Sequence, residues 1–424
     1  MKFKGKKVLI AGLGLNKGGV SAARFFCSQG SLVTVTDLKN KEYLKESLND
    51  LKKYKIKYTL GRHKIKDFLE NDLIIKNPAI PNNSYYLNLA RKKGIPVETD
   101  INLFFKLAKG YIIGVTGTKG KTTTCYLLYE FFKKNNVFLA GNLGISPLDF
   151  VLKLNSRSIT ILELSSFALE NLNFSPNLAV ITNIYPDHLN RYKNIKEYVK
   201  AKKRIFKFQK KEDLLVLNYD IPCLRNISAH YFSETNKKAD CYLKNNKIFF
   251  KNKFICETNL LNSLPAVLSA KLLNVPNYRI KEAISGFKGV PNRQEFIAEK
   301  KGIKYINDTT ATMPQAVQKA IQIFSPIILI AGGQDKGLDY KELSEDIKKN
   351  VKFLILLKGT ATDKLKKYLK NYYIFSCMEK AVKKASLLAK KGDYVVLSPG
   401  AASFGLFKNE FDRGEQFKKA VKKI

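Results

Sequence analysis

Several features that would point to other classes of protein are missing from this chain of 424 residues. No apolar run approaches the ~18 residues of a membrane-spanning helix, so we expect no membrane insertion. The six cysteines are scattered and form no C-x-x-C pair, which argues against a structural zinc site and favours a cytoplasmic location. The chain also has no internal repeat and no low-complexity segment, so we expect ordinary globular domains.

Acidic residues are scarce. The chain has 36 Asp and Glu against 75 Lys and Arg, which gives a formal net charge of +39. A surface for nucleic acid or an anionic membrane would explain such an excess. The basic residues are spread along the chain, however, and an electrostatic footprint requires clustering. We therefore expect no nucleic-acid partner, and a nucleic-acid-binding ATPase stays an alternative.

The most informative stretch is glycine-rich and covers residues 114–124. An apolar run at 111–113 predicts a strand before it, and a helical pattern over 123–133 follows it. Backbone N–H groups and the helix N-terminus of such an element face a bound anion. Lys121 adds a positive charge, and a threonine hydroxyl can reach Mg²⁺. The spacing G-x-x-G-x-x-G-K-T departs by one position from the commonest phosphate loop, but its context favours nucleotide binding.

The rest of the chain alternates strands and helices, which indicates an α/β fold with parallel sheets. The length predicts about three domains, divided at turn-rich segments. We expect a Rossmann-like N-terminal domain over residues 1–107 and a central P-loop-type ATPase domain with a mostly parallel sheet over 108–289. A C-terminal Rossmann-like α/β domain would cover 290–424.

A second glycine-rich turn lies in the first domain. Gly12 and Gly14 follow a predicted strand, and Asp37 ends the next one, as in half of a Rossmann-type unit. The spacing departs from G-x-G-x-x-G, so it supports a nucleotide or nucleotide-sugar site more than NAD. A dinucleotide-dependent oxidoreductase is the alternative, but it leaves the loop at 114–124 unexplained.

Polar residues end two strands of the central domain. Glu163 follows a predicted strand at 158–162, and Asp187 and His188 come shortly after another at 178–181. Strand ends in an open α/β sheet lie where ligands bind. A carboxylate and a histidine beside a phosphate loop predict Mg²⁺ near a transferred phosphate.

Two further helices are predicted, over 195–208 and 259–273. The first is very rich in lysine, and we expect most of these lysines to face solvent. The last third of the chain again places polar and glycine-rich segments directly after predicted strands, at 332–337 and 398–403.

Five stretches together resemble the Mur ligases of peptidoglycan synthesis. They are 114–124, 162–167, 187–192, 332–339 and 397–414. The resemblance covers nearly the whole chain and all three domains. The last stretch is the most specific to the family member that adds D-glutamate.

The resemblance implies an ATP-dependent ligase acting on UDP-N-acetylmuramoyl-L-alanine and D-glutamate. ATP would phosphorylate the carboxylate of the first substrate, and the amine of D-glutamate would attack the acyl phosphate. The resemblance also implies two Mg²⁺ ions, and we expect a monomer. Another Mur-type ligase or a folylpolyglutamate-type amide ligase stays an alternative, because such enzymes share the loop and the metal residues.

The resemblance also implies site residues around ATP and the metal ions. The ATP-binding positions would be Gly117, Thr118, Lys119, Gly120, Lys121, Thr122, Thr123, Asn262, Arg293 and Asp308. The metal ligands would be Thr122, Glu163, His188 and Lys202, the last as a carbamylated lysine. Lys200 and Lys203 are close enough to leave that choice open. Catalytic roles would fall on Lys121, His188 and Lys202.

The remaining implied positions bind the other two substrates. A uracil pocket would be formed by Leu15, Asn16, Thr36 and Asp37. Asn142 would line the site of the sugar-linked acid. D-glutamate would be held by Thr312, Lys336 and Ser403.

Overall fold

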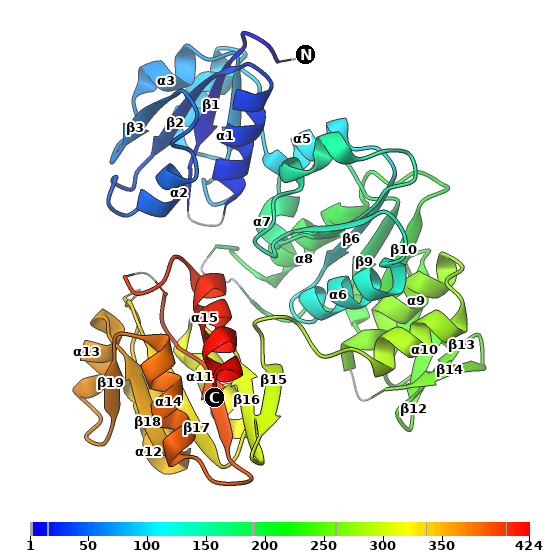
Figure 1. Cartoon of the computed structure of the whole chain (residues 1–424). Coiled ribbons are helices and arrows are strands. Elements are labelled where there is room, and N and C mark those ends of the chain that lie inside the picture. Colours follow the sequence, from blue (N-terminus) through cyan, green and yellow to red (C-terminus); the bar gives the residue numbers. More distant parts are fainter. Residues whose placement is uncertain (1–2, 15–16, 188–190, 259–260, 336, 404) are drawn as a thin grey trace. The chain divides into compact units, whose positions relative to one another are not determined.

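The computed structural model describes the chain except for residues 1–2, 15–16, 188–190, 259–260, 336 and 404 (Figure 1). The chain forms two compact units, residues 1–287 and 288–424. The first unit contains a five-stranded and a nine-stranded sheet, and the second contains a six-stranded sheet. Among the described residues, no helix is long and apolar enough to cross a membrane.

The five-stranded sheet has the order β3-β2-β1-β4-β5 and is parallel throughout. Its strands are β1 (Lys7–Ala11), β2 (Leu32–Asp37), β3 (Ile56–Leu60), β4 (Leu73–Lys76) and β5 (Val97–Glu98). The helices are α1 (Gly18–Ser28), α2 (Lys45–Asn49), α3 (Ile65–Leu69), α4 (Tyr85–Lys92) and α5 (Asp100–Leu107). Alternate residues of β1 face opposite sides of the sheet. Val8 and Ile10 join the cluster that contains Phe26 of α1, whereas Leu9 joins the cluster of Phe68.

The nine-stranded sheet has the order β14-β13-β12-β11-β10-β9-β6-β8-β7 and is parallel except for β12-β13-β14. Its strands are β6 (Tyr111–Thr116), β7 (Val137–Gly141), β8 (Ile159–Glu163), β9 (Leu178–Ile181), β10 (Leu214–Asn218), β11 (His230–Ser233), β12 (Cys241–Lys244), β13 (Lys247–Phe250) and β14 (Lys253–Glu257).

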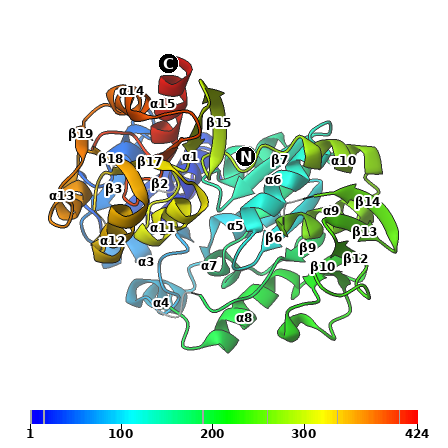
Figure 2. The ribbon, with the colours of Figure 1, turned by 90° about the horizontal axis from the view of Figure 1, so that it is seen from below.

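The helices of this part of the chain are α6 (Lys121–Phe132), α7 (Ser166–Leu169), α8 (Ile195–Lys203), α9 (Leu264–Leu272) and α10 (Asn277–Ser285). Short 3₁₀ turns are η1 (Pro147–Asp149), η2 (Val151–Lys153), η3 (Arg204–Phe206), η4 (Pro222–Leu224) and η5 (Leu261–Ser263). Helix α6 lies beside α9 and α10 in both views (Figures 1 and 2). Leu127 and Phe131 of α6 pack with Ile113 and Val115 of β6 and with Val267 of α9.

The sheet of the second unit has the order β15-β16-β20-β17-β18-β19, with only β15 antiparallel to its neighbour among the described pairs. Its strands are β15 (Glu295–Lys300), β16 (Ile303–Asn307), β17 (Ile327–Gly332), β18 (Val351–Leu357), β19 (Tyr373–Phe375) and β20 (Tyr394–Leu397). The helices are α11 (Pro314–Ile323), α12 (Lys341–Asn350), α13 (Thr360–Lys366), α14 (Met378–Leu388) and α15 (Glu410–Lys422). Two apolar clusters cover its two faces.

The predicted α/β fold with mostly parallel sheets is confirmed, but some predicted helix bounds are wrong. The helix predicted over 195–208 ends as an α-helix at Lys203 and tightens into η3, a common way for a helix to end. The helix predicted over 259–273 begins only at Leu264. Pro265 lies in its first turn, where the missing N–H costs no hydrogen bond. The helix predicted from 123 begins two residues earlier, at Lys121, directly after Gly120.

Candidate functional site

The glycine-rich loop between β6 and α6 lies tightly against its neighbours. Gly117 has a φ of 151° and Gly120 a φ of 80°, conformations that favour glycine. A side chain at Gly117 would collide with the hydroxyl of Thr182, and one at Gly120 with the amide oxygen of Asn262. Both positions therefore favour glycine for their backbone conformation, and a larger residue would also have to displace Thr182 or Asn262.

Two lysine ammonium groups meet at this loop. Lys121 Nζ donates hydrogen bonds of 2.9 Å to the carbonyls of Gly117 and Thr118. Lys202 Nζ, from α8, donates a bond of 2.8 Å to the same Gly117 carbonyl. Burial lowers the pKa of Lys202 to about 7, the positive charge of Lys121 lowers it further, and Asp187 opposes both effects. A large share of Lys202 side chains is therefore uncharged at neutral pH.

The two neighbouring lysines of α8 lie differently. Lys202 is 1% exposed, whereas Lys200 is exposed and Lys203 is half-buried. Lys200 and Lys203 line an open groove together with Lys196 and Lys207. The helical period thus directs Lys202 toward the glycine-rich loop, and Lys196, Lys200 and Lys203 of the same helix to the groove.

Glu163 ends β8 beside the loop, as the strand pattern predicts. Its carboxylate accepts a bond of 2.7 Å from the Thr122 hydroxyl and one of 3.0 Å from the Asn142 amide. The backbone N–H of Asn142 also donates to the Glu163 carbonyl at 2.9 Å. Thr122, Asn142 and Glu163 are therefore held as one group, and Glu163 is only 3% exposed.

The oxygen donors of this group suit Mg²⁺, which prefers carboxylate and hydroxyl oxygens. Within the described part of the chain, no three or more His, Cys, Asp or Glu side chains gather into a metal site. Mg²⁺ at phosphate-transfer sites usually takes one or two carboxylates and completes its shell with substrate phosphates and water. Glu163 and Thr122 fit that pattern.

Asn183 fixes the loop amides, and it follows the end of β9, where polar residues are expected to face a ligand. Its side-chain oxygen accepts the N–H of Lys119 at 2.8 Å, and its carbonyl accepts the N–H of Thr118 at 3.0 Å. The Thr118 hydroxyl lies 3.2 Å from that of Tyr198. Thr123, in the first turn of α6, is half-buried.

In the first sheet, the structure brings Asp37 to the second glycine turn. The Asp37 carboxylate accepts the N–H of Gly14 at 3.0 Å. Thr36 is buried, and its hydroxyl lies 2.8 Å from His63 Nδ1. Burial lowers the pKa of His63, so its ring is largely neutral near pH 7. Nothing in the sequence pattern points to His63.

Asp308 of the second unit is buried and held from two sides. The hydroxyl of Ser398 donates to its carboxylate at 2.9 Å, and the N–H of Gln294 donates at 3.1 Å. Burial raises the pKa of Asp308 to about 6, and these two hydrogen bonds and the nearby charge of Arg293 oppose the rise. Arg293 itself is exposed.

Ser403 is buried in the loop that follows β20. Its hydroxyl has no hydrogen-bond partner among the described residues. Thr312 is half-buried in another loop of the same unit. An unsatisfied buried hydroxyl costs free energy, so a ligand that bonds to Ser403 would be favoured.

Arg413 of α15 is fully buried and joins two loops of the second unit. It donates to the carbonyl of Thr309 at 2.8 Å, to the Thr309 hydroxyl at 3.0 Å and to the carbonyl of Ala401 at 3.1 Å. Burial lowers its pKa to about 9. Arg413 therefore fixes the segment after β16 to the segment after β20.

Four of the predicted site residues lie outside the described part of the chain: Leu15, Asn16, His188 and Lys336.

Comparison with known proteins gives a match in each third of the chain. Residues 6–99 match the Mur ligase MurD-like N-terminal domain, 115–280 the Mur ligase middle domain and 292–400 the Mur ligase glutamate ligase domain. A UDP-N-acetylmuramoylalanine–D-glutamate ligase of Roseiflexus is 38% identical, and the alignment covers 99% of each chain. The chain belongs to the Mur ligase family.

The Mur ligases are ATP-dependent ligases, so this chain is an enzyme that uses ATP. A D-glutamate ligase of Caldanaerobacter subterraneus is also 38% identical over 99% of both chains. Among solved structures, UDP-N-acetylmuramate-alanine ligase MurC of Thermotoga maritima covers 99% of each chain, with a TM-score of 0.62 and 21% identity. That likeness shows that the Mur ligase fold is shared.

Proposed function

We propose that this Mur ligase adds D-glutamate to UDP-N-acetylmuramoyl-L-alanine. One observation carries the proposal: the chain aligns over 98% or more of its length, and of theirs, with ligases named for that reaction. ATP would transfer its terminal phosphoryl group to the substrate carboxylate and leave ADP. The amine of D-glutamate would then attack the acyl phosphate carbon, lose a proton and expel phosphate, which leaves an amide bond.

We assign a substrate to each part of the chain. Residues 1–107 would bind the nucleotide-sugar, with Thr36, Asp37, Leu15 and Asn16 around the uracil. Residues 108–289 would bind ATP, and 290–424 would bind the amino acid. The carboxylate of Asp37 at the first glycine turn supports the first assignment, because it can accept hydrogen bonds from a neutral base.

The phosphate loop would bind the phosphates of ATP through its amides and Lys121. Thr122 and Glu163 would hold one Mg²⁺, and His188 would belong to a second Mg²⁺ site. When bound, these ions offset the charge that spreads over the phosphoryl group in the transition state. Asn142 orients the Glu163 carboxylate by its 3.0 Å hydrogen bond, and it would also line the site of the sugar-linked acid.

Lys202 is our choice for the carbamylated lysine. It is buried at the loop and its pKa of about 7 leaves a neutral amine, which is the nucleophile that CO₂ requires. Addition of the amine to CO₂ with loss of a proton gives an anionic carbamate. Its oxygens would suit a hard cation, whereas an ammonium group would repel one. The exposed Lys200 lacks these surroundings.

Asp308 and Arg293 of the second unit stay our predictions for contacts to the ribose or base of ATP, and so does Asn262 of the first unit. Thr312, Lys336 and Ser403 would hold D-glutamate. The buried hydroxyl of Ser403, which has no partner among the described residues, supports this choice. A cytoplasmic monomer stays our prediction for location and assembly.

The test is an acceptor panel. Phosphate release from ATP is measured with UDP-N-acetylmuramoyl-L-alanine and each of a set of D- and L-amino acids. We expect release above background with D-glutamate. A higher rate with another acceptor and none with D-glutamate would overturn the proposal. Hydroxylamine in place of the amino acid should trap the acyl phosphate as a hydroxamate, and turnover of ATP without hydroxamate would exclude that intermediate.

A further inference from the structure

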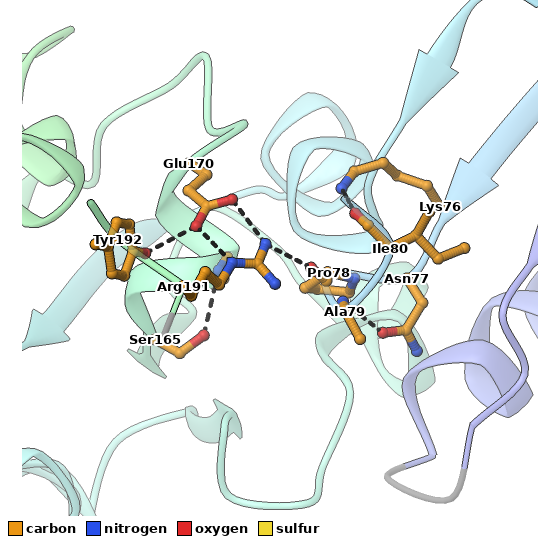
Figure 3. Close-up of polar contacts among 10 residues, drawn as sticks. Lys76, Asn77, Pro78, Ala79, Ile80, Ser165, Glu170, Arg191 and Tyr192 are labelled. Carbon is orange, nitrogen blue, oxygen red and sulfur yellow. Dashed lines mark hydrogen bonds and ion pairs between the residues drawn. The ribbon is translucent and has the colours of Figure 1, made fainter. Parts of the chain in front are cut away.

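Arg191 is held by a set of contacts that the proposed substrate roles do not explain (Figure 3). Its guanidinium donates two hydrogen bonds to Glu170, of 3.0 Å from Nε and 2.8 Å from Nη2. It also stacks on Phe167, with 4.3 Å between the guanidinium carbon and the ring centroid. The Tyr192 hydroxyl donates to the same carboxylate at 2.8 Å. Two-pronged pairing and stacking define an orientation that a lysine could not reproduce.

On one side, Arg191 reaches the first sheet. Its Nη2 donates to the carbonyl of Pro78 at 3.2 Å, in the loop that follows β4 (Figure 3). Pro78 lines a small cavity together with Gly12 and Asn77. The Asn77 amide also donates to the carbonyl of Gly12 at 3.4 Å. The loop that Arg191 holds therefore borders the glycine turn of the first domain.

On the other side, the same cluster reaches the phosphate loop. The ring of Tyr192 packs against that of Tyr198, with centroids 5.3 Å apart. The Tyr198 hydroxyl lies 3.2 Å from the Thr118 hydroxyl. The Lys202 ammonium lies 4.6 Å from the centroid of the Tyr198 ring. A continuous series of contacts thus joins Pro78 to the site where ATP is expected.

We propose that Arg191 is a positioning residue that couples nucleotide-sugar binding in the first domain to the phosphate loop. Glu170, Tyr192 and Tyr198 carry the coupling between them. The inference rests on the proposed function, because it requires both substrates. The Arg191 and Glu170 side chains are 24% and 16% exposed, so this two-pronged pair contributes to the local fold as well as to the coupling. A second variant that keeps the pair is therefore needed to separate the two effects.

The test measures binding alone. The affinity for adenylyl imidodiphosphate, an ATP analogue that is not hydrolysed, is determined by calorimetry with Mg²⁺, with and without saturating UDP-N-acetylmuramoyl-L-alanine. In the unmodified enzyme we expect the sugar-linked acid to tighten analogue binding about fivefold or more, a usual size for coupled sites. In Arg191→Gln the factor should fall close to one, while each ligand alone binds about as before.

Tyr192→Phe is the second variant, because it keeps the ring and the Arg191–Glu170 pair and loses the hydroxyl that bonds to Glu170. We expect a coupling factor between those of the unmodified enzyme and Arg191→Gln. Two matched controls should keep the full factor. Arg225→Gln removes an arginine that stacks on Tyr219, and Tyr242→Phe removes a hydroxyl bonded to Asn252. Neither residue belongs to the series of contacts around Arg191.

A full coupling factor in folded Arg191→Gln and Tyr192→Phe would overturn the inference, as would the lack of coupling in the unmodified enzyme. If Arg191→Gln fails to fold, a full factor in Tyr192→Phe is sufficient to overturn it. The proposed function has a separate readout, since the acceptor panel measures phosphate release. An enzyme that ligates D-glutamate without this coupling would contradict the inference and leave the proposed function standing.

Discussion

The glycine turn after β1 and the glycine-rich loop after β6 each connect a strand to a helix, but the charged side chains around them differ. In the turn after β1, the N–H of Gly14 donates to the carboxylate of Asp37. In the loop after β6, the carbonyl of Gly117 accepts bonds from the ammonium groups of Lys121 and Lys202. Both elements lead into a helix N-terminus, which favours anions. The neighbouring side chains therefore decide which ligand suits each turn: the cation of Lys121 favours a polyphosphate, and the carboxylate of Asp37 favours N–H and hydroxyl donors.

The largest effect is expected when the positive charge of Lys121 is removed from the glycine-rich loop. Lys121→Ala should lower kcat by about 10³-fold, because the charge on the transferred phosphoryl group loses a fixed partner. Steady-state phosphate release measures the loss. Lys134→Ala, which removes an exposed lysine beyond the end of α6, should keep nearly full activity. A folded Lys121→Ala enzyme with a loss below tenfold would contradict the assignment.

Replacing the second lysine should have a smaller effect. Lys202→Ala should lower kcat by about 10²-fold, and added acetate should restore part of the activity if a carbamate is the active form. Lys200→Ala, from the exposed side of the same helix, is the matched control.

The carbamate can also be detected directly. With a pKa of about 7, Lys202 loses its proton as the pH rises through neutrality, so the amine becomes more reactive toward CO₂ with increasing pH. Carbon NMR with labelled bicarbonate should show a carbamate signal that grows with pH over this window and is missing in Lys202→Ala. Equal signals in both proteins would exclude Lys202.

A substitution beside the glycine turn after β1 should change KM rather than kcat. Asp37→Asn removes a charge that accepts the N–H groups of Gly14 and Lys39. We expect the KM for UDP-N-acetylmuramoyl-L-alanine to rise about tenfold, from the loss of charged hydrogen bonds, with the KM for ATP nearly unchanged. Asp346→Asn, in the second unit, should change neither. Parallel changes in both KM values would show that the two turns do not have separate ligands.

The smallest expected effect is on stability. Two glycine substitutions separate the cost of a steric collision from the cost of a left-handed backbone. Gly120→Ala combines a positive φ with a collision against Asn262, whereas Gly61→Ala has a φ of 77° and open space around it. Denaturant unfolding should show a loss of about 1–2 kcal/mol for Gly61→Ala, the cost of a left-handed backbone. Gly120→Ala should lose roughly 1 kcal/mol more, because overpacking adds to that cost. Equal losses would mean that Asn262 can move aside.

The difference between the turns also shows which parts of the site a sequence can predict. Lys121 and Glu163 are predictable because one belongs to a local motif and the other ends a strand. His63 and Glu170 are different, since neither belongs to a local motif or ends a strand, and only the folded chain brings them to Thr36 and Arg191. Asn183 follows the end of β9, but its bonds to the loop amides appear only in the fold. Helix ends are only partly predictable. Pro265 explains why α9 begins at Leu264, but the helical period of the sequence alone does not show this start.

Arg413 has a consequence for any attempt to redesign acceptor choice. One guanidinium holds the carbonyls of Thr309 and Ala401, so it braces the loops that carry Asp308 and Ser403, in addition to the bond between Ser398 and Asp308. A loop transplanted from another ligase would lack its own partner for the hydrogen bonds that Arg413 of α15 donates. We expect such grafts to succeed only when both loops and α15 are exchanged together.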